Sequence, residues 1–283
     1  MKVFKDFKAL RRGLGGLQNK GKRIGFVPTM GCLHEGHLSI VRRAKQENDS
    51  VVVSIFINPL QFGPKEDYAR YPRNILGDKK LLAAEKTDFL YLPDPNNFYK
   101  TDFQTCVSLH KLALPLCGAA RPTHFSGVCT AVLKLLNSVT PDVLYLGQKD
   151  YQQFCVIKQM ILDLDIPVRV KMVPVMREPD GLAMSSRNVF LSLAERQEAL
   201  LLHRSLQTAR QCIKAGQRDT DKIKKAMREK LSSMRHGRID YIEIVDSETL
   251  DSVIELTERS EILAAVAVFF NKARLIDNFL IKV

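Results

Sequence analysis

Hydrophobic and polar positions in roughly the first 175 residues follow two alternating patterns. Short runs of apolar and β-branched residues, typical of strands, are separated by longer segments whose apolar residues recur at helical spacing. The runs expected to form strands are residues 23–28, 50–57, 88–92, 142–146 and 168–175. The segments expected to form helices are residues 35–47, 75–85, 126–138 and 151–164. Runs such as VVVSIFI suit a sheet covered on both faces. The alternation therefore predicts an α/β fold: a Rossmann-like, mainly parallel sheet with helices on both faces.

The pattern changes in the last third of the chain. A helix should begin after Ser192, because Ser192 and Glu195 match the S-x-x-E capping box, and it should end at Ala215 before Gly216. A second, basic helix is expected near residues 219–234, followed by the strand-like segments DYIEIV, ILAAVAVFF and NFLIKV. Helices followed by strands, without strict alternation, predict a smaller C-terminal α+β domain.

The length and composition are those of a globular protein with two domains. Of the 283 residues, 45% are hydrophobic and 26% are charged, which excludes disordered and fibrous classes. We expect domains over residues 1–176 and 177–283, with a linker near residues 176–190. The longest apolar run, residues 262–270, is far shorter than the roughly 20 residues of a membrane-spanning helix. The amino terminus, MKVFKDFKAL, scatters charges among apolar residues and matches no signal peptide, so a cytoplasmic protein without a membrane partner is expected.

The net charge of +12 allows a nucleic-acid partner or an anionic substrate. Residues 201–240 contain eleven Lys and Arg against four acids, so more than half of the excess lies in this segment of the second domain. No RNP-like aromatic motif, KH loop or zinc knuckle accompanies them. We therefore interpret this block as a solvated surface and expect no nucleic-acid partner.

The strongest local motif is VPTMGCLHEGHLSIV, residues 27–41, where a strand ends, a glycine-containing turn follows and a helix begins. Helix-start N–H groups and the helix dipole favour phosphate at such a turn. His34 and His37 share one helical face, and Gly36 between them allows a close approach of phosphate or ribose. Two imidazoles here could stabilise charge as an α-phosphorus is attacked. The alternatives are a metal-binding pair or two solvated histidines. Cys32 is expected to pack rather than to act as a nucleophile.

Two more segments follow expected strands and reach the same edge of the sheet. Gln61, in NPLQF, can both donate and accept hydrogen bonds, which suits a substrate with hydroxyls and a carboxylate. In GQKDYQQ, Lys149 offers a charge for phosphate and Asp150 can accept ribose hydroxyls, with Gln153 one helical turn beyond. Taken alone, Gln61 would be a loop glutamine, and Lys149 with Asp150 an exposed ion pair.

A third segment, MSSR at residues 184–187, combines two hydroxyls with a guanidinium. Arg187 can bind phosphate oxygens with two donors, and Ser185 and Ser186 can add hydrogen bonds. The alternative is a turn that leads into the next helix. Arg121 and His124, in RPTHF, are expected to be further groups of the pocket.

The H-x-G-H element at residues 34–37 resembles that of the nucleotidyltransferase superfamily, which includes class I aminoacyl-tRNA synthetases. A wider set of blocks is similar to the pantothenate synthetase (pantoate–β-alanine ligase) family, in that family's order from residue 28 to 188. These blocks are PTMGCLHEGH, FINPLQF, YPR, RPTHFSGV, GQKDYQQ and REPDGLAMSSRN. Six blocks together are far more specific than H-x-G-H alone.

The resemblance implies an ATP-dependent condensation of (R)-pantoate with β-alanine to pantothenate. Family enzymes first form a pantoyl adenylate with release of pyrophosphate, and attack by the β-alanine amine then releases AMP. The resemblance also implies a homodimer, a second domain that acts as a lid over the active site, and Mg²⁺ held mainly by the ATP phosphates.

Residue roles carried over from the family complete the expectation. His34 and His37 would be catalytic, with His37 the acid or charge stabiliser. Gln61 and Gln153 would bind pantoate and Gln61 also β-alanine, with Asn58 and Tyr71 nearby. The residues expected to bind ATP are Met30, Gly31, Cys32, Leu33, His34, Glu35, Gly36, His37, Gly147, Gln148, Lys149, Asp150, Met176, Met184, Ser185, Ser186 and Arg187.

Two positions depart from the family pattern. Gln148 stands where the family has glutamate, which puts in doubt any role that needs a carboxylate there. The acidic stretch after YPR is reduced to Asp78, so no protein ligand for a metal is assigned.

Two other enzyme classes share part of this pattern. A class I tRNA synthetase would need an anticodon- or acceptor-binding region, and the residues after MSSR leave little room for one. A nucleotidyltransferase that acts on a phosphate acceptor would need more cations than the pair Gln61 and Gln153 provides.

Overall fold

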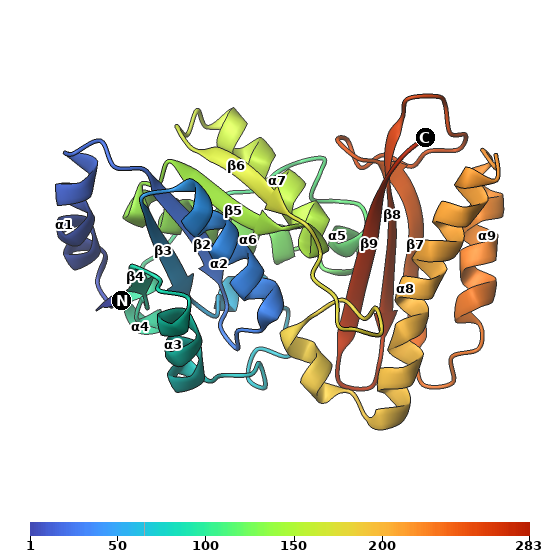
Figure 1. The fold of residues 1–283 in the computed structure, drawn as a ribbon, viewed down its shortest axis with the longest axis horizontal. Coiled ribbons are helices and arrows are strands. Elements are labelled where there is room, and N and C mark those ends of the chain that lie inside the picture. The colour runs from blue at the N-terminus through green and yellow to red at the C-terminus, as the bar shows by residue number, and fades with distance from the viewer. Residues whose placement is uncertain (65) are drawn as a thin grey trace. The chain divides into compact units, whose positions relative to one another are not determined.

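A computed structural model describes residues 1–64 and 66–283, which form two compact units (Figure 1). The first unit contains Met1–Gln148 and Gln153–Pro174, and the second contains Lys149–Gln152 and Val175–Val283. Each unit has its own cluster of buried apolar residues.

The first unit is built on a six-stranded sheet in which every pair of neighbouring strands is parallel. In spatial order the strands are β1 (Lys2–Phe4), β4 (Phe89–Tyr91), β3 (Ser50–Ile55), β2 (Ile24–Thr29), β5 (Val143–Gly147) and β6 (Arg169–Val173). The predicted parallel α/β sheet is confirmed.

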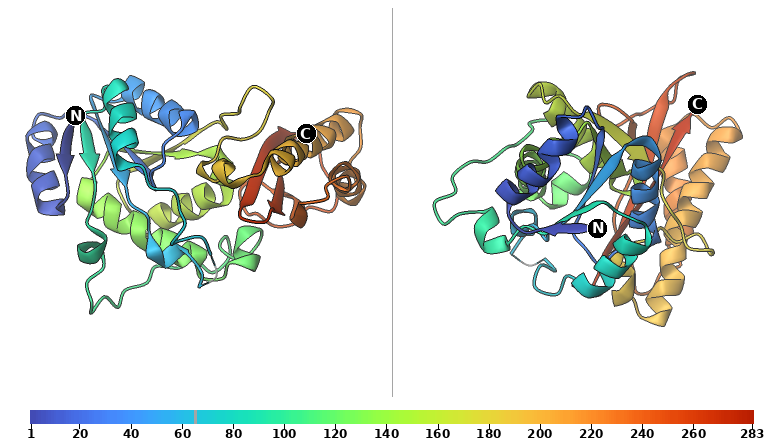
Figure 2. Two further views of the ribbon diagram at one scale, coloured as in Figure 1. Left: turned by 90° about the horizontal axis from the view of Figure 1, so that it is seen from below. Right: turned by 60° about the vertical axis from the view of Figure 1, so that its left-hand side comes forward.

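Helices flank both faces of this sheet. The longer ones are α1 (Phe7–Gln18), α2 (Glu35–Glu47), α3 (Ile75–Ala84), α6 (His124–Val139) and α7 (Tyr151–Asp163). The short ones are α4 (Pro95–Phe98), α5 (Cys117–Ala120), η1 (Pro59–Gln61) and η2 (Gln148–Asp150). Figure 2 shows α2 and α6 on opposite faces of the sheet. The chain moves across the sheet in one direction after β2 and in the other direction after β4. Right-handed crossovers then place the two connecting helices on opposite faces.

The strand order places a topological switch point beside β2. From β2 the chain moves outward through β3 and β4, and it then returns to β5 on the other side of β2. Ligands of open α/β sheets bind outside the carboxyl ends of the strands at such a point. The segments after β2, β3 and β5, which contain the H-x-G-H turn, Gln61 and GQKD, therefore lie at the expected edge.

The second unit is the predicted smaller α+β fold. It contains η3 (Ser186–Phe190), α8 (Leu193–Lys214), α9 (Thr220–Leu231) and the antiparallel strands β7 (Arg238–Asp246), β8 (Glu261–Phe269) and β9 (Arg274–Lys282), in the order β7-β8-β9. The capping box at the start of α8 is present: the Ser192 hydroxyl accepts from the Glu195 N–H, and the Glu195 carboxylate accepts from the Ser192 N–H. Both helices share a buried cluster with the sheet, in which Leu206, Met227 and Val266 are fully buried.

The sequence pattern missed β1 and α1. Three glycines weaken the helical signal of α1, so packing rather than intrinsic propensity decides that segment. A Cβ at Gly13 would lie 2.5 Å from the Phe4 ring, which explains why glycine fits there. α9 ends at Leu231, earlier than expected from the pattern. Across the described residues, no helix is both long enough and apolar enough to traverse a bilayer.

Candidate functional site

The turn between β2 and α2 is held in place by a buried carboxylate. Gly31 (φ 85°) and Cys32 (φ 49°) both have left-handed backbone conformations. Asp78, on α3 and only 2% exposed, accepts hydrogen bonds from the N–H groups of Cys32 (2.9 Å) and Leu33 (2.7 Å). A Cβ on Gly31 would come within 3.0 Å of the Asp78 carboxylate, so the turn and the carboxylate fit closely. Burial raises the pKa of Asp78 even though these two donors act to lower it.

His34 and His37 cap the start of α2 reciprocally. The Nδ1 atom of His34 accepts from the Gly36 N–H (3.1 Å), and Nδ1 of His37 accepts from the His34 N–H (3.3 Å). The ring centroids are 4.1 Å apart. Because Nδ1 is the acceptor in both rings, hydrogen bonding assigns the proton of each neutral imidazole to Nε2. Both rings are thus fixed as Nε2–H donors, which is the form that can donate to phosphate oxygens.

Four backbone N–H groups of this turn have acceptors within the protein. The N–H groups of Cys32 and Leu33 donate to Asp78, and those of His34 and Gly36 donate to imidazole nitrogens. These internal bonds leave the side chains of the turn as the main candidates for contacts to phosphate. Burial, with a smaller contribution from the Asp78 carboxylate, raises the pKa of Cys32, which disfavours a nucleophilic thiolate.

The Glu35 side chain has an ion-pair partner within the protein. Its carboxylate pairs with Arg42, which also bonds Glu85 at 2.6 Å. Only the backbone of Glu35 therefore remains a candidate for the nucleotide.

Gln61 lies at the end of η1, directly after β3, and contacts the predicted ATP-binding turn. Its Nε2 lies 3.1 Å from the Met30 sulfur, and its Oε1 accepts from Asn58 Nδ2 at 3.0 Å. Asn58 is buried and accepts in turn from the Tyr99 hydroxyl at 2.9 Å. The structure therefore brings together Met30, expected at ATP, and Gln61, expected at pantoate. Asn58 orients the Gln61 amide.

Arg121 and His124 hold the Gln61 backbone. Arg121 forms two hydrogen bonds to the Glu66 carboxylate (2.6 and 2.5 Å) and donates to the Gln61 carbonyl oxygen at 3.2 Å. His124 Nδ1 lies 2.9 Å from the same oxygen. Burial would raise the pKa of Glu66, but Arg121 lowers it below the usual value. The Arg121 charge is thus balanced within the protein, and its observed contacts position Gln61.

The segment after β5 divides between the two units. Gly147 ends β5, and Gly147, Gln148 and Gln153 belong to the first unit, where Gln153 is half-buried on α7. Lys149 and Asp150 belong to the second unit and form an ion pair of 3.6 Å. The structure thus shows the ion pair that the sequence allowed as the alternative for these two residues. Their contacts to phosphate and ribose remain a prediction.

The segment that contains MSSR forms a hairpin within the second unit. Arg177 and Ala183 form an antiparallel bridge, and the Met184 N–H donates to the Met176 carbonyl at 3.0 Å. Met176 and Met184, both expected at ATP, are therefore neighbours.

The motif itself starts a short helix. The Ser185 hydroxyl caps η3 by accepting from the Arg187 N–H at 3.3 Å, and Ser186 is buried. A small cavity is lined by Lys149, Ser185, Asn188 and Asp277, among others, so the two segments of this unit that are expected to bind ATP border one space.

Sequence reasoning missed three buried polar residues that hold these motifs. Asp78 was noted only as a remnant of an acidic stretch, and Asp277 and Asn278 on β9 were not singled out. The side chains of Asp277 and Asn278 contact Arg177 and Lys149, respectively. The adjacent polar pair within the apolar strand RLIDNFLIK was an available signal, because buried polar groups require partners.

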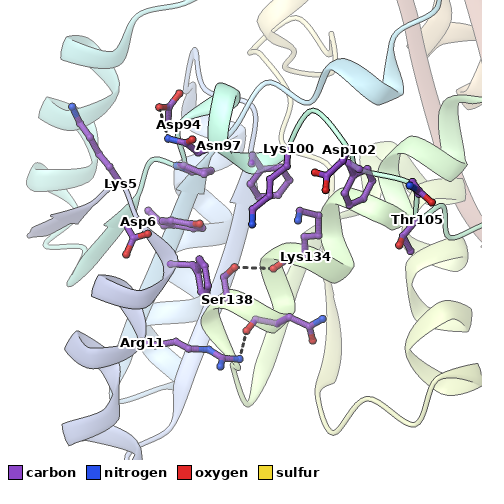
Figure 3. Close-up of a pocket in the computed structure, with 17 residues that line it drawn as sticks. Lys5, Asp6, Arg11, Asp94, Asn97, Lys100, Asp102, Thr105, Lys134 and Ser138 are labelled. Atoms are coloured by element: carbon purple, nitrogen blue, oxygen red, sulfur yellow. Dashed lines mark hydrogen bonds between the residues drawn. The ribbon is translucent and has the colours of Figure 1, made fainter.

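A separate cavity of about 590 Å³ lies where β1 and β4 end (Figure 3). Lys5 and Asp94 follow these strands, and Lys134 projects from α6. The Lys134 amine lies 5.1 Å from the Phe98 ring centroid and 5.0 Å from that of Phe103. None of the residues expected at the active site lines this cavity.

Among residues 1–64 and 66–283, no group of three or more His, Cys, Asp or Glu side chains could hold a metal ion. Both oxygens of Asp78 accept backbone N–H groups, so the contacts that the structure shows for this carboxylate support the turn.

The family model described as pantoate-beta-alanine ligase matches residues 2–280. A curated pantothenate synthetase of Thermotoga neapolitana is 51% identical over 278 residues, covering 98% of this chain and 99% of the relative. That of Caldicellulosiruptor bescii is 51% identical over 266 residues and covers 94% of each chain.

Solved structures with the same names are also similar to this chain. Pantothenate synthetase from Thermus thermophilus superposes with a TM-score of 0.94 at 42% identity, covering 100% of both chains. Pantoate-beta-alanine ligase from Francisella tularensis, complexed with beta-gamma ATP and beta-alanine, gives a TM-score of 0.80 at 35% identity, covering 99% of this chain and 97% of that one.

Proposed function

The chain belongs to the pantoate-beta-alanine ligase family, and on that basis we propose that it condenses (R)-pantoate with β-alanine to pantothenate at the expense of ATP. The carboxylate of pantoate is activated as a pantoyl adenylate, with release of pyrophosphate and then AMP. The observation that carries the proposal is the match along almost the whole chain, together with the paired imidazoles at the carboxyl end of β2. The Francisella relative, which contains beta-gamma ATP and beta-alanine, supports the same substrates here.

In the first step a pantoate carboxylate oxygen attacks the α-phosphorus of ATP. A new P–O bond forms, the bond from the α-phosphorus to the bridging oxygen breaks, and pyrophosphate leaves with the electron pair. The Nε2–H groups of His34 and His37 donate to phosphate oxygens, where negative charge accumulates in the transition state. His37 is the main charge stabiliser. The turn from Met30 to His37 surrounds the nucleotide, and its shape is supported by Asp78.

In the second step the amine of β-alanine attacks the carbonyl carbon of the adenylate. A C–N bond forms, AMP leaves with the electrons of the C–O bond, and the ammonium loses its proton. Gln61 and Gln153 hold pantoate, and Gln61 also holds β-alanine. The Asn58 contact fixes which end of the Gln61 amide donates and which accepts.

The second unit supplies the remaining ATP contacts. Lys149 and Arg187 bind phosphate oxygens, Ser185 and Ser186 add hydroxyl donors, and Met176 and Met184 contact the adenine. Gly147, Gln148 and Asp150 complete the nucleotide site. Residues 177–283 act as a lid, because an acyl adenylate exposed to water would hydrolyse before the amine arrives.

We include Mg²⁺ in the proposal as the companion of the ATP phosphates. Among the described residues no group of three or more His, Cys, Asp or Glu side chains could hold the ion, so ATP phosphates and water would provide most of its ligands. When bound, Mg²⁺ neutralises phosphate charge. We include cytoplasmic location and a homodimer in the proposal; light scattering should then give about twice the chain mass of 32.1 kDa.

The products test the proposed function. With ATP, Mg²⁺, (R)-pantoate and β-alanine, the enzyme should form pantothenate, AMP and pyrophosphate in equal amounts, measured by chromatography and a pyrophosphate assay. Formation of ADP and inorganic phosphate would overturn the adenylate mechanism. Aminoacylation of tRNA with a protein amino acid would instead support the synthetase alternative.

A further inference from the structure

Strand β9 contains two adjacent polar residues that are almost completely buried. Asp277 is 3% exposed and Asn278 is 4% exposed, within the otherwise largely apolar sequence RLIDNFLIK. Burying a charge and an amide in a sheet is costly unless both find partners. Both side chains contact segments that the proposed function assigns to ATP.

Asn278 fixes the backbone at Lys149. Its Nδ2 donates to the Lys149 carbonyl oxygen at 2.9 Å, although the two residues are 129 positions apart in the sequence. A second bond nearby has the same effect, because the Tyr151 hydroxyl donates to the Ser247 carbonyl at 3.0 Å. Residues Lys149–Gln152 therefore belong to the second unit although the residues on either side belong to the first.

Asp277 fixes the hairpin that precedes MSSR. Its oxygens accept from the Arg177 guanidinium at 2.6 and 2.9 Å, and the Asp277 side chain is 2% exposed. Arg177 also donates to the Gly181 carbonyl at 3.1 Å, which closes the hairpin. The bridge from Arg177 to Ala183 then sets where Met184 begins the motif.

The two supported segments meet beside β9. The small cavity described above is lined by Lys149, Ser185 and Asp277. The segment that Asn278 holds and the motif that follows the Asp277-bound hairpin therefore border one space. Figure 1 shows β9 as part of the three-stranded sheet next to the segment that precedes α8. A shift of either contact would move Lys149 relative to Ser185.

We propose that Asp277 and Asn278 are positioning residues that set Lys149 and the hairpin leading to Ser185 at the spacing that ATP requires. The inference rests on the proposed function in that ATP is taken as the ligand of these segments. Neither side chain needs to touch the nucleotide. Their effect is to preorganise two ATP contacts that are far apart in the sequence.

Binding of a non-reacting nucleotide tests this directly. The dissociation constant of α,β-methylene ATP with Mg²⁺ is measured by calorimetry for the wild type, Asn278→Ala and Asp277→Asn. Each variant should bind about tenfold more weakly, the effect of one lost positioning hydrogen bond. In steady-state assays, KM for ATP should rise by a similar factor while kcat falls by less than about threefold.

A matched control is available on the same sheet. Asp240 of β7 bonds Arg274 of β9 at 2.9 and 2.6 Å, and both side chains are largely buried. Asp240→Asn should also lower the melting temperature, because it breaks the same kind of ion pair, but it should keep the wild-type affinity for the analogue within about twofold.

The outcomes separate this inference from the proposed function. If Asn278→Ala and Asp277→Asn both bind the analogue like the wild type, or no more weakly than Asp240→Asn, the positioning role is overturned. If Asp277→Asn does not fold, Asn278→Ala alone decides, since it removes an uncharged contact. A wild type that binds the analogue but forms no pantothenate would overturn the proposed reaction and leave this comparison intact. A wild type that does not bind it would overturn both.

Discussion

Nδ1 of His37 accepts a hydrogen bond from the backbone N–H of His34 at 3.3 Å. The His34 ring caps the Gly36 N–H in return. A pair that could be interpreted from the sequence only as two imidazoles on one helical face is thus an N-terminal capping box in which both rings have a defined tautomer. Nδ1 of each ring caps the helix, and the Nε2–H group is the donor on which the proposed chemistry depends.

These two roles of His37 can be separated by two substitutions. His37→Asn retains an acceptor at the position of Nδ1 but lacks the Nε2–H, whereas His37→Ala lacks both. Both variants should lower the rate of adenylate formation roughly 100- to 1000-fold, as the loss of a transition-state donor does. Only His37→Ala should also lose about 1 kcal/mol of stability through the missing cap, measured by denaturant unfolding. Near-normal adenylation by His37→Asn would restrict His37 to capping.

Asp78 should affect ATP binding without affecting the magnesium requirement. In Asp78→Asn one of the two acceptors for Cys32 and Leu33 is replaced by a donor, so the turn should loosen and KM for ATP should rise about tenfold. The Mg²⁺ concentration for half-maximal activity at saturating ATP should stay the same. A marked increase in that concentration would identify Asp78 as a metal ligand and contradict the positioning role.

Gln61 should determine the affinity for pantoate, and Asn58 should affect that affinity by orienting the Gln61 amide. Gln61→Ala should raise KM for pantoate about tenfold or more, because hydrogen bonds to a charged carboxylate are lost, while KM for ATP changes little. Asn58→Ala should have a smaller effect in the same direction. Tyr99→Phe is the control, since it removes only the bond from Tyr99 to Asn58. An unchanged KM for pantoate in Gln61→Ala would remove Gln61 from that site.

Glu47 should make the stability of the first unit depend on acid pH. The Lys171 ammonium, followed by the Tyr145 hydroxyl, lowers the pKa of Glu47 to about 2 from an ordinary value of 4.5. The unfolded chain therefore binds a proton first as the pH falls, so the stabilisation is complete above about pH 4.5 and is lost toward pH 2.

The test of Glu47 compares Glu47→Gln with the wild type. At pH 7 the variant should be less stable by about 1 kcal/mol, since the ion pairs of Glu47 are partly exposed to solvent. The difference should shrink as the pH falls from 4.5 to 2 in thermal or urea unfolding. A difference that stays constant over that range would show that the Glu47 charge does not contribute.

The sequence predicted elements whose signals are local. Residues 35–47 form α2 with the predicted bounds, and Ser192 caps α8 as expected. The strand β1 was missed because it has three residues, and α1 because its glycines hide the helical pattern. In both cases packing against neighbours outweighs local propensity.

The same distinction between local and long-range signals applies to the candidate site. The motifs that contain His34, His37 and Gln61 are contiguous and follow strands, so their meeting at one edge of the sheet follows from topology. The contacts that hold them span the sequence: 45 residues separate Asp78 from Leu33, and 129 separate Asn278 from Lys149. No periodicity or motif indicates such pairs, because only the folded backbone brings them together.

Exchange of labelled pyrophosphate into ATP detects the pantoyl adenylate without the second step. Rapid exchange is expected with (R)-pantoate and Mg²⁺ in the absence of β-alanine, and pantothenate only after β-alanine is added. Exchange that requires β-alanine, or that proceeds with a protein amino acid in place of pantoate, would contradict the pantoyl adenylate mechanism.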